Sequence, residues 1–338
     1  MQFWNFNQKY YDKGGIPRFW TWLEFNISVD YDALFEQYSS YGVRGVNIDT
    51  HGDIEILSAL VIIARKYKIE VYVWFWGLNQ IALAAHHPEW LDYNANGDSL
   101  ATTKAYVEHY KFMNPAIPEF REVLQQQIKE LCHIEGLKGI SLDFTRYVDV
   151  FLPVGIQPKY GIVQDKVYPE WDYGYHPVAI EKFKILHGYD PRTVPNPSQD
   201  ALWQQFRLQQ VVECVLPLVD IVHDNGLKIS ASPFPTPALS RLMVLQDWDK
   251  WYLDFYLPMI YYGFYNHDYK WVGKCTKECV EAVTPAKIIS AIFLNDVVKD
   301  QIDLKEVIQL AMDNGSIGLA FFGNPNAASL EAIKEYRK

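Results

Sequence analysis

Three features of the sequence predict a closed (β/α)8 TIM barrel of the α/β class. Eight short runs of nearly all apolar residues recur along the chain, and a helical pattern follows each of them. Strands that are buried on both faces lose the alternation of polar and apolar residues, as these runs do. The length of 338 residues suits one barrel enlarged by loop insertions, so we expect a single domain over residues 1–338.

The expected strands are rich in β-branched and aromatic residues and end at polar or turn-forming positions, as buried strands usually do. They span residues 18–26, 43–50, 69–79, 137–147, 227–234, 255–263, 287–296 and 316–324. Each strand would be followed by a crossover helix that returns the chain to the start of the next strand. Consecutive units of this kind pair in parallel and close into a barrel.

The expected helices repeat apolar residues every three or four positions. They span residues 30–42, 53–67, 119–134, 201–226, 240–251, 271–283, 303–315 and 326–338. Several are bounded by an Asp or Asn cap and a closing Gly, as at Asp30 and Gly42 or at Asp303 and Gly315.

Two connections are longer than a minimal barrel needs, and we expect them as insertions after strands three and four. The first spans residues 80–118, and the second spans residues 150–200, with its own helix at 176–189. Both leave from the carboxyl ends of strands, so they should crown the catalytic face. We interpret the second, which carries Trp171 in the stretch VYPEWDYGY, as one wall of a substrate cleft; a packing or dimer insertion is the alternative.

The charge balance argues against nucleic acid as a partner. The chain has 41 Asp and Glu against 31 Lys and Arg, and no basic run is long enough to follow a phosphate backbone. Charged residues interrupt every apolar run well before the roughly 18 residues of a membrane span, so no span is expected. We expect a monomer or a weak homo-oligomer.

The first residues lack the basic start and the apolar stretch of a signal peptide. A periplasmic or secreted location is expected if a signal peptide was removed ahead of residue 1, and a cytoplasmic location otherwise. The cysteines fall in helical patterns that form neither a disulfide framework nor a zinc motif, so we expect them to be inert. They are Cys132, Cys214, Cys275 and Cys279.

Aromatic residues are unusually frequent, with 11 Trp and 23 Tyr, and such a surplus is typical of sugar-binding clefts. Five of them gather at the ends of strands one, three and six: Trp22, Trp74, Trp76, Tyr261 and Tyr262. All five are candidate substrate-binding residues, but alternate strand residues face the barrel, so not all can reach its interior. We expect Trp22, Trp74 and Trp76 to stack on sugar rings, with barrel and helix packing as the alternative. Asn79 and Asn324, at the ends of strands three and eight, are candidate partners for sugar hydroxyls.

Carboxylates close several of the strands, and glycoside cleavage needs two of them, one to donate a proton and one to attack carbon or activate water. Asp143 is the first candidate because the apolar run ISLD ends on it and Arg146 and Tyr147 follow closely. A guanidinium near Asp143 would hold it ionised, which suits a nucleophile or base. The alternative for Asp143 is a plain salt bridge to Arg146. Arg146 and Tyr147 are expected to bind substrate, and the alternative for Arg146 is that it only braces the barrel mouth.

The proton donor has two candidates. Asp296 follows strand seven but is also suited to cap the next helix, and Glu24 ends strand one, where it could instead bind hydroxyls. Asp49 and Asp268 are expected to bind substrate, although Asp49 could serve a turn or pair with His51.

Cofactors are not expected. The Asp49 and His51 pair resembles a fragment of a metal site, but further ligands are not evident from other strands, so we expect no metal. No Lys ends a strand, and the last two loops lack a Gly-rich phosphate cradle, which argues against Schiff-base aldolases and phosphorylated substrates.

Several segments together resemble the glycosyl-hydrolase-like family ten barrels. They are HPEWL, MNPAIPEFREVL, LKGISLDFTRYVD, AIEKFKILHGYDPR, QDWDKWYLDFYLPMIYY and SIGLAFFGN, in this order. This chain departs from the family pattern at Lys138 and Gly139, where Asp-Gly is usual, and at Val148, where Pro is common. The resemblance implies a TIM barrel that acts on carbohydrate.

The leading hypothesis is therefore hydrolysis of a glycosidic bond in an oligo- or polysaccharide by carboxylate acid and base chemistry. A non-catalytic carbohydrate-binding barrel is a second hypothesis, and a transglycosylase, lyase or isomerase on the same fold is a third. The sequence leaves open the sugar, the anomer, retention or inversion, and endo or exo action.

Overall fold

A closed parallel barrel of eight strands forms the centre of the molecule, in the order β1-β2-β3-β4-β5-β6-β7-β8, as the sequence predicts. The structure is a computed structural model and describes residues 11–336. The strands are β1 (Phe19–Glu24), β2 (Gly45–Asp49), β3 (Glu70–Trp76), β4 (Gly139–Asp143), β5 (Lys228–Ala231), β6 (Phe255–Tyr256), β7 (Lys287–Phe293) and β8 (Gly318–Phe322).

Strand β6 is much shorter than the run at 255–263 suggests. Pro258 follows it closely, and a proline cannot donate a ladder hydrogen bond from its nitrogen. Tyr261 and Tyr262 therefore lie beyond the strand, and a 3-10 turn, η5 (Tyr262–Tyr265), begins at the second of them.

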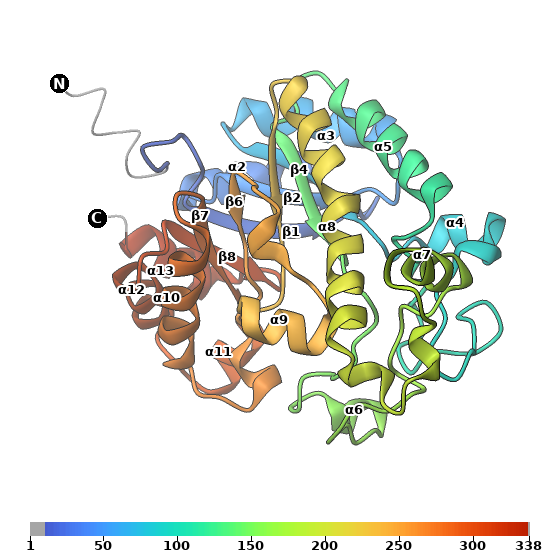
Figure 1. The fold of residues 1–338 in the computed structure, drawn as a ribbon. Helices are drawn as coiled ribbons and strands as arrows, with labels where there is room; N and C mark the ends of the chain where they lie inside the picture. The colour runs from blue at the N-terminus through green and yellow to red at the C-terminus, as the bar shows by residue number, and fades with distance from the viewer. Residues whose placement is uncertain (1–10, 337–338) are drawn as a thin grey trace.

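Helices surround the barrel (Figure 1), and the predicted ones are present except that at 240–251. They are α2 (Tyr31–Tyr41), α3 (Ile54–Lys66), α4 (Ile81–His86), α5 (Pro118–Cys132), α6 (Gln157–Tyr160), α7 (Pro177–His187), α8 (Ala201–Asp224), α9 (Pro237–Val244), α10 (Trp271–Val283), α11 (Leu294–Lys299), α12 (Leu304–Asp313) and α13 (Ala327–Tyr336). The helix expected at 240–251 is instead α9 followed by a 3-10 turn, η4 (Trp248–Lys250).

The caps follow from the sequence. The Asp30 side chain accepts a hydrogen bond from the backbone N–H of Ala33, and Gly42 ends α2 with a φ of 103°. Asp303 caps the start of α12 in the same way. At the other end of α12 the C-cap is Asn314 and not the expected Gly315, which follows it. Aspartate oxygens satisfy backbone donors that have no partner in the first turn, and glycine tolerates the left-handed conformation at the end.

Aromatic rings fill the barrel interior near the amino-terminal ends of the strands, opposite the mouth. The ring centroid of Trp20 lies 4.9 Å from that of Tyr72, which lies 5.6 Å from that of Phe255. Glycines leave the room that these rings need: a Cβ on Gly45 would come 2.2 Å from Trp20, and one on Gly139 would come 2.4 Å from Tyr72.

Polar groups, among them the hydroxyl of Tyr72, occupy the barrel between these rings and the mouth. Ser141 and Ser230 are register partners on β4 and β5, and Asn47 and Tyr72 are register partners on β2 and β3. Ser232 follows directly after β5. All five are at most 3% exposed, and the Asn47 amide and the four hydroxyls find no hydrogen-bond partner among the described residues.

The insertions after β3 and β4 lie together on one side of the barrel, where α4, α6 and α7 are seen away from both termini in Figure 1. A bridge between Asn94 and Tyr173 joins the two insertions. Tyr173 and Tyr175 are 3% exposed, so the expectation that the whole stretch VYPEWDYGY faces a cleft is wrong for these two. Tyr175 packs with Phe183 of α7 and Trp203 of α8 in a small core that belongs to the insertion.

The cysteines Cys132, Cys214, Cys275 and Cys279 are free and buried. Each lies in a helix, as predicted. Over residues 11–336, none of the helices is both long and apolar enough to cross a membrane.

Candidate functional site

A hollow of about 320 Å³ lies at the carboxyl end of the barrel strands, and we call it the aromatic cavity. Eleven of its lining residues are Trp, Tyr or Phe and three are charged. The full lining is Trp22, Trp74, Trp76, Val107, His109, Tyr110, Asp143, Phe144, Arg146, Asp149, Leu152, Pro153, Ile156, Tyr160, Phe234, Met259, Tyr261, Phe264, Tyr265 and Phe322. Six of these were predicted from the sequence: Trp22, Trp74, Trp76, Asp143, Arg146 and Tyr261.

Asp143 is the last residue of β4 and is only 8% exposed. Its Oδ2 accepts a hydrogen bond from Nε1 of Trp74 at 2.8 Å, and its Oδ1 accepts one from the backbone N–H of Phe144 at 2.7 Å. Burial raises the pKa of Asp143 from 3.8 to about 6, against the lowering by these two donors and by the charge of Arg146. A carboxyl group held this way can gain or lose a proton near neutral pH.

The expected pairing of Asp143 with a guanidinium is corrected by the structure. Nη1 of Arg146 lies 3.2 Å from Oδ2 of Asp149, and its Nη2 donates to the hydroxyl of Tyr110 at 3.3 Å. The guanidinium carbon lies 5.1 Å from the ring centroid of Phe234 and 5.4 Å from that of Phe144. The charge of Arg146 is thus neutralised by Asp149 and enclosed by rings, and Asp143 is left as the unpaired acid of the cavity.

A second hollow, of about 570 Å³, adjoins the first, and we call it the outer cleft. Trp22, Trp74 and Phe322 line both hollows, so the two meet along these rings. The remaining residues of the outer cleft are Leu23, Glu24, Asn26, Val29, Tyr31, Leu34, Gln37, Tyr38, Gly323, Asn324 and Pro325. The sequence-predicted Glu24 and Asn324 therefore lie next to the aromatic cavity rather than in it.

Glu24 and Asp49 are register partners at the ends of β1 and β2, and His51 lies between their side chains. Nε2 of His51 is 3.2 Å from Oε1 of Glu24, and its Nδ1 is 3.5 Å from Oδ2 of Asp49. The Glu24 side chain is 68% exposed and that of Asp49 15%. Burial raises the pKa of Asp49, while hydrogen bonding to the backbone of His51 and its imidazole lower it.

Asp296 does not end β7 but lies inside α11. Its Oδ2 accepts a hydrogen bond from the backbone N–H of Gly263 at 3.2 Å, and burial raises its pKa. It lines neither hollow, nor does the exposed Asp268, whose Oδ1 accepts from the backbone N–H of Lys270 before α10.

Four further predicted binding residues also lie outside both hollows. Asn79 is 1% exposed and its Oδ1 accepts from the backbone N–H of Lys111. Tyr147 is 1% exposed and Tyr262 is 0% exposed. Trp171 is half-buried against the rings of Tyr106 and Tyr168.

Sequence reasoning missed two polar residues of the aromatic cavity, His109 and Asp149. His109 comes from the insertion after β3, and its ring lies 6.0 Å from those of Trp76 and Phe144. Burial, followed by the charge of Arg146, lowers the pKa of His109. No periodic pattern marks either residue, because both lie on irregular segments.

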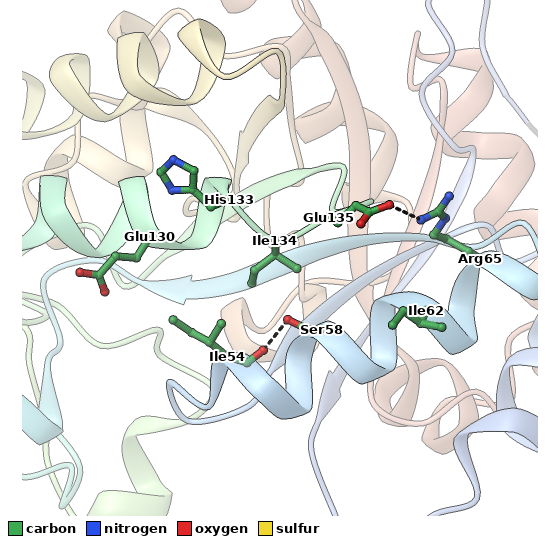
Figure 2. A pocket seen from close by; sticks show the side chains of 8 residues that line it. All are labelled: Ile54, Ser58, Ile62, Arg65, Glu130, His133, Ile134 and Glu135. Carbon is green, nitrogen blue, oxygen red and sulfur yellow. Dashed lines mark hydrogen bonds and ion pairs between the residues drawn. The ribbon is translucent and has the colours of Figure 1, made fainter.

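A hollow of about 360 Å³ between α3 and α5 lies on the outer layer of helices, as Figure 2 shows. Ile54, Ser58 and Ile62 line it from α3, and Arg65 pairs with Glu135 at 3.9 Å at one end. It contains no strand-end residue of the barrel. We therefore place the candidate site at the mouth and not here.

Metal ligands are not grouped in the part of the chain that the structure describes: no three His, Cys, Asp or Glu side chains are arranged to hold an ion. Glu24, His51 and Asp49 form a chain of contacts rather than a shared centre.

Three solved structures share the barrel fold. The PgaB (BpsB) glycoside hydrolase domain from Bordetella bronchiseptica matches with a TM-score of 0.68 at 12% identity, over 95% of this chain and 98% of that one. A β-galactosidase from the haloarchaeon Halorubrum lacusprofundi gives 0.62 at 10% identity, over 95% of this chain and 57% of its own. A class V chitinase from Pseudomonas fluorescens gives 0.55 at 11% identity, over 94% and 99%.

No family model matches the chain, and no curated protein matches it. The resemblance to glycosyl-hydrolase-like family ten barrels thus stays a prediction. At the identities given above, the likeness to solved structures establishes the fold.

Proposed function

We propose that this chain hydrolyses glycosidic bonds at the mouth of its barrel, with Asp143 as nucleophile or general base. The observation that carries the proposal is Asp143 itself, an acid at the end of β4, buried among tryptophan rings and unpaired by any guanidinium. Strand ends at this face supply the catalytic residues of TIM-barrel enzymes. Aromatic rings beside a carboxylate suit a sugar, whose C–H faces stack on them.

The two donors to Asp143 favour its ionised form, because the N–H groups of Trp74 and Phe144 both point at carboxylate oxygens. They also fix the orientation of the carboxylate, as attack on an anomeric carbon or on water requires. Burial opposes ionisation and keeps the carboxylate basic.

Glu24 is the proton donor that we propose in preference to Asp296. Glu24 lines the outer cleft beside Trp22 and Trp74, whereas Asp296 lines neither hollow and accepts a hydrogen bond from Gly263. His51 links Glu24 to Asp49 and could return a proton to Glu24 after each turnover. In the reaction the leaving oxygen takes the proton from Glu24, and water adds its hydroxyl to the anomeric carbon. The remaining proton of that water goes to Asp143 when Asp143 is the base, or back to Glu24 when Asp143 has first bonded to the anomeric carbon and is then released.

Two likenesses support the carbohydrate assignment. Three structures with this fold are a glycoside hydrolase domain, a β-galactosidase and a chitinase. The segments HPEWL and LKGISLDFTRYVD resemble the family ten barrels.

The test is a screen of polysaccharides and nitrophenyl glycosides with the wild type, Asp143→Asn and Asp220→Asn. We expect turnover to fall about 10³-fold or more in Asp143→Asn, because the variant keeps the shape but loses charge and basicity. Asp220 is exposed on α8, so its variant serves as the matched control. Normal activity of Asp143→Asn would refute the assignment.

The role of Glu24 is tested by the leaving group. Nitrophenolate leaves without a proton, so Glu24→Gln should retain more activity on nitrophenyl glycosides than on methyl glycosides. An equal loss on both would remove Glu24 from the donor role.

A non-catalytic carbohydrate-binding barrel is the second candidate, and one observation favours it. The carboxylates that line the aromatic cavity are Asp143 and Asp149, and Asp149 is bound to Arg146 and Tyr110. Sugar binding by both the wild type and Asp143→Asn, with no release of reducing ends from any polysaccharide, would support this candidate.

A further inference from the structure

The two hollows at the mouth differ in the chemistry of their walls. The outer cleft offers the carboxylate of Glu24 and the amides of Asn26, Gln37 and Asn324. The aromatic cavity is lined by rings and aliphatic side chains except at His109 and three charged residues. Two of those charges, Arg146 and Asp149, pair with each other at 3.2 Å.

A sugar can stack on the rings where the two hollows meet, but full enclosure in the aromatic cavity suits a sugar poorly. Each buried hydroxyl needs a hydrogen-bond partner, and an unpaired one costs free energy. Beyond Asp143 and His109, the groups of the lining that could pair with hydroxyls are the tips of Tyr and Trp rings, and most of the wall is ring face or aliphatic side chain. An apolar group gives up no hydrogen bond when it enters the cavity, and its transfer out of water is favourable in free energy.

We propose that the aromatic cavity binds the apolar aglycone of an amphiphilic glycoside, an alkyl or aryl group, while the sugar occupies the outer cleft. This inference rests on the proposed function and names its substrate class. The hollows meet at Trp22, Trp74 and Phe322, and Trp74 also donates to Asp143, so the bond between sugar and aglycone would lie beside this carboxylate. Hydrolysis then places the hydroxyl of water on the sugar and releases the aglycone as an alcohol or phenol.

The first experiment measures binding of the apolar group alone, with 1-butanol, 1-hexanol and 1-octanol as probes, by calorimetry and tryptophan fluorescence. Each buried methylene should tighten binding about threefold to fourfold until the cavity is full, with a negative heat-capacity change. Glycerol, in which every carbon carries a hydroxyl group, should not bind. Affinity that does not depend on chain length would overturn the proposal.

Two variants on the segment after β4 distinguish binding inside the aromatic cavity from binding elsewhere on the surface. Ile156 lines the aromatic cavity and is half-buried, while Val154 is 53% exposed and lines neither hollow. Ile156→Gln should weaken 1-octanol binding several-fold, because it places an amide in the apolar wall, and Val154→Gln should leave it unchanged. Equal effects of the two variants would also overturn the proposal.

Hydrolysis distinguishes this inference from the function on which it rests. For octyl and methyl glycosides of the same sugar, we expect a lower KM for the octyl compound in the wild type and loss of turnover of both in Asp143→Asn. Turnover of both with equal KM would refute the aglycone site and keep the hydrolase. Chain-length-dependent binding of alcohols without turnover of any glycoside would refute the hydrolase and leave a cavity for apolar ligands.

Discussion

Asp143 experiences two opposing influences at one carboxyl group. Burial favours the protonated form and raises its pKa to about 6, while Trp74 and Phe144 donate hydrogen bonds that favour the ionised form. The balance places its titration within the range in which enzymes are commonly assayed.

The activity of the wild type should rise with pH through about 6, because a nucleophile or base acts in the ionised form. Trp74→Phe removes a donor to the ionised carboxylate, so this rise should move to higher pH. Trp76→Phe is the matched control, since Trp76 lines the same cavity from the same strand but its buried Nε1 has no described hydrogen-bond partner. Profiles of kcat/KM against pH measure both, and an equal displacement in the two variants would contradict the assignment.

The stability of the fold should depend on Asp143 with a defined sign. Its pKa in the folded chain, about 6, lies above 3.8, so folding favours the protonated form. The cost of burying the ionised group is absent below about pH 4 and complete above about pH 6, where it reaches roughly 3 kcal/mol. Asp143→Asn should therefore raise the melting temperature relative to the wild type more at pH 8 than at pH 4.

Helices and strands with regularly spaced apolar residues were predictable from the sequence, while the irregular segments at the mouth were not. Asp30 and Gly42 bound α2 as expected, since their chemistry is local. The pairing of Arg146 was not predictable, because Phe144 adopts a φ of 47° immediately after Asp143. Phenylalanine rarely takes this left-handed conformation, and nothing in LDFTR marks the turn that directs Arg146 to Asp149.

The segment after β4 illustrates the same limit. Its aromatic residues were expected to face substrate, yet Tyr173 and Tyr175 are buried. Arg207 of α8 holds the segment, as its Nη1 donates to Asp172 at 2.5 Å and to the carbonyl of Tyr173 at 2.8 Å. An insertion of this length builds a core of its own with α7 and α8, and composition alone does not separate such rings from those of a cleft.

Gly174→Ala tests the close packing of this segment against Arg207. Gly174 has a φ of 114°, and a Cβ there would lie 2.5 Å from Cδ of Arg207. We expect a loss of about 2 to 3 kcal/mol of unfolding free energy, because strain and a clash with a buried ion pair add together. Gly161→Ala is the control, since its φ is 64° with no atom within 4 Å, and should cost about 1 kcal/mol. Equal losses in urea denaturation would contradict the contact with Arg207.

The whole barrel has a polar middle between an aromatic base and an aromatic mouth. Trp20 and Tyr72 fill the base, and Trp22 and Trp74 lie at the mouth. The alternation of residues along β1 and β3 places all four inside. Between them the amide of Asn47 and the hydroxyls of Ser141 and Ser230 are buried without a described partner.

These groups predict ordered water inside the barrel. A buried polar group without a hydrogen bond costs about 1 to 3 kcal/mol, and buried waters usually satisfy such groups with about three hydrogen bonds each. A crystal structure at high resolution should therefore show water bonded to Asn47, Ser141 and Ser230. Asn47→Leu should destabilise the fold by about 1 to 3 kcal/mol, because it leaves the water and the serines short of a partner. If the interior were dry, the same substitution would stabilise the fold, since it would remove an unsatisfied amide and bury an apolar group of similar size.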